Sequence, residues 1–131
     1  MGAFSNYMEE RIVEHFLRNT AVATPTTVYL ALFQTDPGEA GAGTETSYTN
    51  YARVATTWTA LDANGQTKNS GAVAFAANGN ASASVTITHA AIFDAASGGN
   101  MLLYGPLSSS KVLAVGDVLS FQPNALALTL D

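Results

Sequence analysis

The sequence has no cysteine and little charge, and each of these absences excludes classes of protein. With no Cys among 131 residues, the chain can form no disulfide framework, no thiolate metal site and no Cys nucleophile. Charged residues make up 11% of the chain, against about 25% in an average soluble domain. Because hydrophobic residues reach 47%, the composition is the reverse of an intrinsically disordered chain. We therefore expect one folded domain.

Positive charge is scarcer than negative charge. Five Lys and Arg stand against ten Asp and Glu, which gives a formal net charge of -5. Nucleic-acid binding draws most of its affinity from clustered cations, so no nucleic-acid partner is expected. Apolar runs of about 18 residues, as in a transmembrane helix, do not occur. Glu9 and Glu10 interrupt the apolar region that a signal peptide would need. We expect no membrane partner and synthesis in the cytoplasm.

The N-terminal segment, residues 1–20, carries the one helical pattern. Its apolar positions share one face of a helix and predict an amphipathic helix over residues 5–18 that packs on the domain. These positions are Met8, Ile12, Val13, Phe16 and Leu17. Ser5 or Asn6 can cap the first turn, Asn6 and Glu9 resemble a capping box, and Asn19 can close the helix. This segment holds five of the fifteen formal charges.

Residues 21–131 show period-two patterns and frequent turns, which predict a mainly β domain. Both faces of Thr27–Gln34 are apolar, so this strand should be central. Short strands separated by Asn-Gly and Gly-rich turns, without helices between them, favour an antiparallel β-sandwich that resembles a jelly roll. The other expected strands are Arg53–Ala60, Gly71–Ala76, Ser82–His89, Ala91–Asp94, Met101–Leu107, Lys111–Val115, Val118–Gln122 and Ala125–Leu130.

No pattern in the sequence predicts catalysis, a metal or a cofactor. Glu10, Glu14 and His15 are the densest titratable cluster, but carboxylate metal sites in bundles draw their ligands from several helices. A solvated helix face is the expected role of these side chains. His89, Asp94 and one of the many serines could be combined into a catalytic triad. Triads are recognised by their geometry, so the presence of these residue types does not predict one. We expect the protein not to be an enzyme.

The scarcity of charge instead predicts permanent contact with other protein surfaces. Interface cores are depleted of Lys, Glu and Asp, and a nearly uncharged surface suits a free monomer poorly. We expect a homo-oligomer. The segments expected to reach a neighbour are the N-terminal helix and the loop Glu39–Asn50, which is long enough to be mobile. The candidate interface residues are Tyr7, Glu39, Glu45, Tyr48 and Tyr51.

Several ordered segments carry a resemblance to a known family. They span nearly the whole chain, and they include Glu14–Thr20, Thr24–Phe33, Asp36–Gly41, Tyr51–Arg53, His89–Asn100 and Leu103–Gly105 with Gly116-Asp117. With these segments the sequence resembles short phage and prophage virion proteins that are often labelled tail fibre protein, some of which look like capsid cement or decoration proteins. The resemblance implies a virion structural role and carries no catalytic signature.

The resemblance and the composition together favour a capsid cement protein, located on the capsid surface of the virion. Its partners would be the major capsid protein and further copies of itself. True fibres have long repetitive stalks, whereas this chain has no heptads and no repeat. The main alternative is a tail fibre or baseplate component of low copy number. A carbohydrate-binding module is the third hypothesis, and an enzyme is the last hypothesis.

Overall fold

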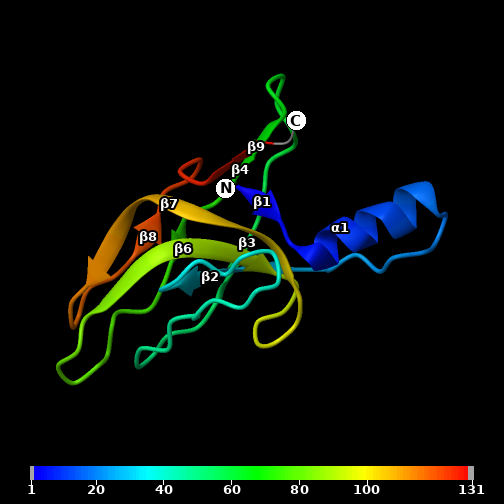
Figure 1. The fold of residues 1–131 in the computed structure, drawn as a ribbon. Coiled ribbons are helices and arrows are strands. Elements are labelled where there is room, and N and C mark those ends of the chain that lie inside the picture. Colours follow the sequence, from blue (N-terminus) through cyan, green and yellow to red (C-terminus); the bar gives the residue numbers. More distant parts are fainter. Residues whose placement is uncertain (1, 130–131) are drawn as a thin grey trace.

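An antiparallel sheet of five strands forms the larger layer of the protein, whose computed structural model describes residues 2–129 (Figure 1). The order across this sheet is β1 (Ala3–Phe4), β7 (Met101–Leu113), β6 (Val85–Phe93), β2 (Val28–Phe33) and β3 (Val54–Thr56). Neighbouring strands in it are antiparallel throughout. β6 and β7 are consecutive in the chain and form the longest pairing, whereas β1 and β2 pair with strands far away in the sequence.

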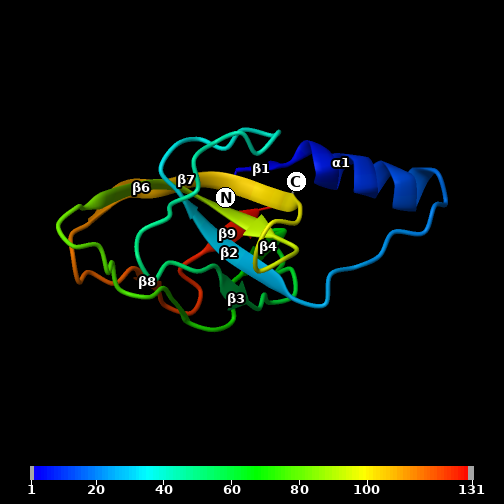
Figure 2. The same ribbon diagram turned by 90° about the horizontal axis from the view of Figure 1, so that it is seen from below.

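Two short ribbons complete the fold. β4 (Gln66–Lys68) pairs with β9 (Ala127–Thr129), and β5 (Val73–Ala74) pairs with β8 (Ser120–Phe121). Figure 2 shows β8 and β9 to one side of the long β6–β7 pair. The expected antiparallel β-sandwich with one N-terminal helix is confirmed. Because two ribbons stand where a jelly roll has a second four-stranded sheet, the jelly-roll arrangement itself is not confirmed.

Strand β2 lies at the centre of the core, as its two apolar faces predict. Leu30 and Leu32, on one face, belong to the main core, while Ala31 and Phe33, on the other face, belong to a smaller cluster with Phe93. All four β2 residues are at most 2% exposed. A strand with both faces buried is typical of the middle of a sheet with covered surfaces.

Two pairs of predicted strands are in fact single strands. Ser82–His89 and Ala91–Asp94 fuse into β6, and Met101–Leu107 and Lys111–Val115 fuse into β7, because β6 and β7 pair along most of their lengths. Arg53–Ala60 is shortened to β3, with only a bridge at Trp58 beyond it. The strands at 71–76, 118–122 and 125–130 are shortened to β5, β8 and β9, and Leu130 lies outside the described residues.

The outer edge of β7 is interrupted soon after β1 ends. β1 pairs only with Leu103 and Tyr104, and the carbonyls of Leu102 and Tyr104 face its side of the strand. By the alternation of an antiparallel strand, Pro106 points to the same edge, and Pro has no N–H to offer there. A register shift follows, in which four residues, 107–110, lie opposite Thr88.

The helix differs most from its prediction. It consists of α1 (Asn6–Ile12) followed by the π-helix η1 (Val13–Leu17). Ser5 caps it by accepting a hydrogen bond from the Met8 N–H at 3.1 Å, and no Asn6–Glu9 capping box forms. Asn19, with φ 54°, ends it in the left-handed conformation. Figure 1 shows the helix projecting beyond the end of the sandwich.

Only the first half of the helix packs on the domain. Tyr7 and Met8 contact the main core. Phe16 and Leu17, in the second half, are 75% and 78% exposed. The expectation that the domain covers the apolar face is therefore wrong for this half, because the sheet ends before the helix does. We call residues 6–18 the helical arm.

Candidate functional site

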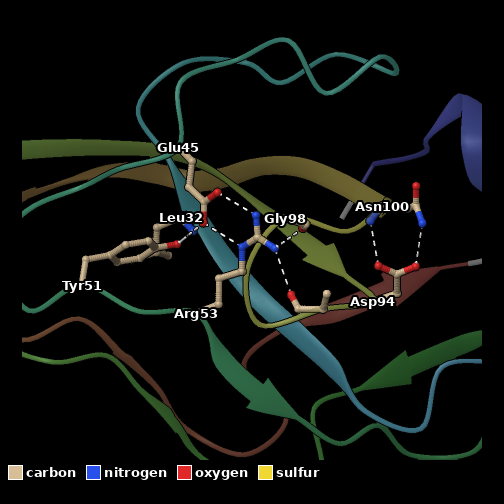
Figure 3. Close-up of polar contacts among 8 residues, drawn as sticks. Leu32, Glu45, Tyr51, Arg53, Asp94, Gly98 and Asn100 are labelled. Atoms are coloured by element: carbon tan, nitrogen blue, oxygen red, sulfur yellow. Dashed lines mark hydrogen bonds and ion pairs between the residues drawn. The ribbon is translucent and has the colours of Figure 1, made fainter.

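The structure places the predicted interface residues in two regions, the helical arm and a polar cluster under the loop that follows β2. Glu45, Tyr51 and Arg53 form this cluster, which we call the loop latch (Figure 3). Tyr7 lies on the arm. Glu39 is exposed, and its carbonyl accepts a hydrogen bond from the Asn6 N–H at 3.0 Å. This bond joins the loop that also carries Glu45 to the start of the arm.

Arg53 is the centre of the loop latch. Its Nε and Nη2 donate to the two carboxylate oxygens of Glu45 at 2.9 and 2.8 Å, a bidentate pair. Nη1 donates to the carbonyls of Ala95 and Gly98 at 2.9 and 2.8 Å. The guanidinium also lies 3.7 Å from the centroid of the Phe93 ring, a cation–π contact. With 7% of its side chain exposed, Arg53 ties two loops to the sheet.

Tyr51 extends the loop latch into the sheet. Its hydroxyl donates to Glu45 Oε1 at 2.7 Å and accepts from the Leu32 N–H at 3.1 Å. Burial raises the pKa of Tyr51, and the adjacent Glu45 carboxylate raises it further, so the phenol stays protonated and keeps donating. The hydroxyl of Tyr51 therefore has an internal role, while a contact of its side chain with a neighbour stays a prediction.

Tyr48 is also an internal residue. Its side chain is 4% exposed, and its hydroxyl donates to the Ala76 carbonyl at 2.8 Å. Its ring meets that of Tyr51 edge to face, with centroids 5.4 Å apart. The prediction of an outward-facing Tyr48 is wrong, because the ring fills the main core below the loop instead.

The loop Glu39–Asn50 is held against the domain. The Gln34 N–H donates to the Thr44 carbonyl at 2.8 Å, and the Thr46 N–H donates to the Leu32 carbonyl at 2.9 Å. Glu45 forms a bridge with Phe33. These bonds extend the β2 ladder along the loop, so the expected mobile, reaching loop is wrong for its second half.

A second loop completes the surface around the loop latch. Asp94 accepts hydrogen bonds from the backbone and side-chain N–H groups of Asn100 at 2.7 and 2.9 Å (Figure 3). Gly99, at φ 71°, lies so close that a Cβ there would come within 2.5 Å of Asp94 Oδ1. The loop 94–100 is thus closed on itself and fastened by Arg53, and it presents a preformed surface.

The sequence offered a signal for the loop latch that residue-type reasoning missed. Glu45 and Arg53 are opposite charges eight residues apart in a region with almost no other charge. Such isolated charges must find partners if they are buried. Because they pair internally, the surface of the sandwich is even poorer in charge than the composition indicates.

The arm lies beside an apolar groove. The groove is about 480 Å³ in volume and lies between the arm and the extended segment 22–25. Its helical side is lined by Tyr7, Met8, Ile12 and Phe16 together with Arg11 and His15. Glu14 and Arg18 form an ion pair of 2.7 Å on the arm.

Among residues 2–129, no group of His, Asp and Glu is placed to hold a metal ion.

A sequence profile described as "Podophage GP4 fiber I protein gp80" matches residues 3–129, nearly the whole chain. The chain belongs to this gp80 family. It is therefore a phage virion structural protein, and the resemblance to tail-fibre-labelled phage proteins is confirmed. No curated protein sequence matches the chain. In the described part of this gp80 family member, no helix is long and apolar enough to cross a membrane.

The loop latch makes the free energy of unfolding of this gp80 family member depend on pH. Burial raises the pKa of Glu45, but the hydrogen bonds from Arg53 and Tyr51 and the Arg53 charge outweigh it, so the pKa lies below its ordinary 4.5. The stabilisation is fully present above pH 4.5 and is lost as the pH falls through the lower, folded-state pKa. We expect Glu45→Gln to cost about 2 kcal/mol at neutral pH and to reduce the acid-dependent loss.

Urea unfolding at neutral pH and at a series of lower pH values measures this effect. Glu39→Gln is the matched control, because Glu39 is exposed. Identical slopes of stability against pH in wild type and Glu45→Gln would contradict the role given to Glu45.

Proposed function

We propose that the chain is a capsid cement protein, a non-enzymatic subunit that binds the major capsid protein lattice in many copies. The observation that carries this proposal is the nearly uncharged surface of the sandwich. Beyond the arm, ten charged residues are spread over 113 positions, and the Glu45–Arg53 pair is turned inward. Interface cores are depleted of charge in the same way.

The shape of the protein supports the same proposal. The described residues contain a short sandwich and one arm of about 18 Å, the length of twelve helical residues, without a repetitive stalk. A ligand that binds only the assembled lattice stabilises it by about 2.7 kcal/mol per site at a hundredfold excess over Kd. Summed over a lattice, such increments oppose the pressure of the packaged genome.

Copy number tests the proposal directly. We expect quantitative mass spectrometry of purified virions to find the chain in numbers comparable with those of the major capsid protein. It should stay with heads when heads and tails are separated. Heads that lack the chain should disassemble at lower temperature and recover when purified chain is added.

The second candidate is a tail-attached fibre or baseplate subunit. The description of the family as a fibre protein favours it. In that case the chain would follow the tail fraction, in a few copies per particle, and its addition would leave the melting of heads unchanged. Either of these two results would overturn the cement proposal.

A further inference from the structure

The sequence contains two Asn-Gly dipeptides, Asn64-Gly65 and Asn78-Gly79, and the fold places them in opposite surroundings. Asn-Gly is prone to deamidation, because glycine has no side chain to keep its amide nitrogen away from the side-chain amide carbon of the preceding residue. Asn64 is exposed, whereas Asn78 is 1% exposed. The same local chemistry is therefore open to solvent at one site and enclosed at the other.

The turn at residues 62–66 leaves the side chain of Asn64 free to react. Within residues 2–129 its side-chain amide has no hydrogen-bond partner. The nucleophile would be the Gly65 amide nitrogen, which donates to the Asp62 carbonyl at 3.1 Å. Because residues 62–64 are all exposed, this turn can open locally at little cost in free energy.

The fold holds the Asn78 site closed. The Asn78 Nδ2 donates to the carbonyls of Ala83 and Leu113 at 3.1 and 2.9 Å. The Gly79 N–H donates to the Thr49 carbonyl at 3.0 Å. A reaction here requires three segments to separate, one of which is the end of β7, where Leu113 belongs to the main core. Openings of that extent have free energies close to that of global unfolding.

We propose that Asn64 deamidates in the folded chain and that the fold protects Asn78. The Gly65 amide nitrogen loses its proton to hydroxide and bonds to the side-chain amide carbon of Asn64. The carbon–nitrogen bond of that side-chain amide breaks, and ammonia leaves with a proton taken from water. Water then opens the resulting succinimide ring at one of its two carbonyls, which gives aspartate or isoaspartate. One water is consumed and one ammonia is released, and no oxidant or reductant takes part.

The product changes the ribbon that begins at this turn. The Asp62 carboxylate accepts hydrogen bonds from the N–H groups of Gln66 and Asn64 at 3.0 and 2.8 Å, and these bonds hold the pKa of Asp62 below its ordinary value. The new carboxylate therefore lies near one that stays charged, and like charges repel. Isoaspartate also adds one carbon to the main chain. Both changes disfavour the turn that sets Gln66 of β4 opposite Thr129 of β9.

Peptide mapping by mass spectrometry during incubation at mildly alkaline pH measures the two sites separately. Trypsin cleaves after Lys and Arg, so residues 54–68 carry Asn64 and residues 69–111 carry Asn78. In the folded chain we expect Asn64 to react at least about tenfold faster, a ratio that needs only about 1.4 kcal/mol between the two openings. In concentrated urea the two rates should become nearly equal, because both sites then read Ala-Asn-Gly.

Two variants test the turn itself. Asn64→Gln should abolish the mass gain in residues 54–68, because glutamine would have to close a six-membered ring, and should leave Asn78 unchanged. Asp62→Ala removes the acceptor that closes the turn and should speed the reaction of Asn64 alone. Hydrogen exchange in β4 and β9 should be faster in the reacted chain than in fresh chain.

Two results would overturn the proposal. One is an Asn64 that stays intact in the folded chain while it reacts in urea. The other is an Asn78 that reacts as fast as Asn64 in the folded chain. Neither result bears on where the chain lies in the virion, so the copy-number measurement is independent of both.

Discussion

Replacing Arg53 with Ala is expected to lower the free energy of unfolding by about 3 to 5 kcal/mol, the usual cost of removing one member of a buried ion pair. The substitution leaves the Glu45 carboxylate without its bidentate partner and the carbonyls of Ala95 and Gly98 without their donor. It also removes the cation over the Phe93 ring. In a domain of this size the melting temperature should fall by about 10 to 20 °C.

Arg53→Lys should recover only part of this loss. Lysine keeps the charge, but its single ammonium group cannot donate to Glu45 and to two carbonyls in the same planar geometry. The control is Arg18→Ala, which breaks the exposed pair with Glu14; such pairs contribute about 0.3 to 0.5 kcal/mol. Calorimetry or urea unfolding measures all three variants. A loss for Arg53→Ala no larger than for Arg18→Ala would show that the loop latch does not stabilise the fold.

Asn69→Ala is expected to have an effect of similar size at the opposite layer of the sandwich. Asn69 is 0% exposed. Its amide nitrogen donates to the carbonyls of Gly71 and Gln122 at 2.8 and 2.9 Å, and its oxygen accepts from the Leu126 N–H at 2.8 Å. Each buried group left without a partner costs about 1 to 3 kcal/mol, so we expect a total loss of about 3 to 5 kcal/mol.

The control for this substitution is Asn64→Ala, because Asn64 is exposed in a turn. We expect it to change the free energy of unfolding by less than about 0.5 kcal/mol. Hydrogen exchange should show that Asn69→Ala frees the backbone amides of β9 and of the residues around Leu126 first. Uniform loss of protection over the whole sheet would instead mean that the two ribbons do not depend on Asn69.

Local patterns were enough to predict the elements that depend on local contacts. The helix follows from the spacing of its apolar residues and ends at Asn19 as predicted. The central position of β2 follows from the apolar residues on both its faces. In both cases the periodicity of a single segment predicts the type of element, but it does not predict the π-helical second half of the arm, Val13–Leu17.

Elements that depend on distant partners were not predictable in this way. β7 continues past three serines, 108–110, which lie in the register shift, because it pairs with β6 on both sides of them. β4 is a polar strand that exists through its pairing with β9. The dipeptide Asn78-Gly79 predicts a tight hairpin turn. In the structure the Asn78 side chain is buried and donates hydrogen bonds to the carbonyls of Ala83 and Leu113. Amphipathicity likewise shows that the arm has an apolar face, but not which surface covers it.

Of the predicted interface residues, Tyr48 is buried, whereas contacts of Tyr7, Glu39, Glu45 and Tyr51 with a neighbour stay predictions. Tyr48 and Tyr51 flank a loop of small residues, which indicated a surface position, whereas aromatic rings next to such loops also fill the space beneath them. Glu45 is 27% exposed and pairs with Arg53. The isolated opposite charges at these two positions are the one sequence pattern that indicates the loop latch.

The interrupted outer edge of β7 has a consequence for how copies of the protein meet. An open strand edge can template endless sheet growth between molecules, and proline and irregular register are known protections against it. Here Pro106 and the shift at residues 107–110 lie on that edge. The outer edge of β7 is therefore protected against pairing with the strand edge of another copy.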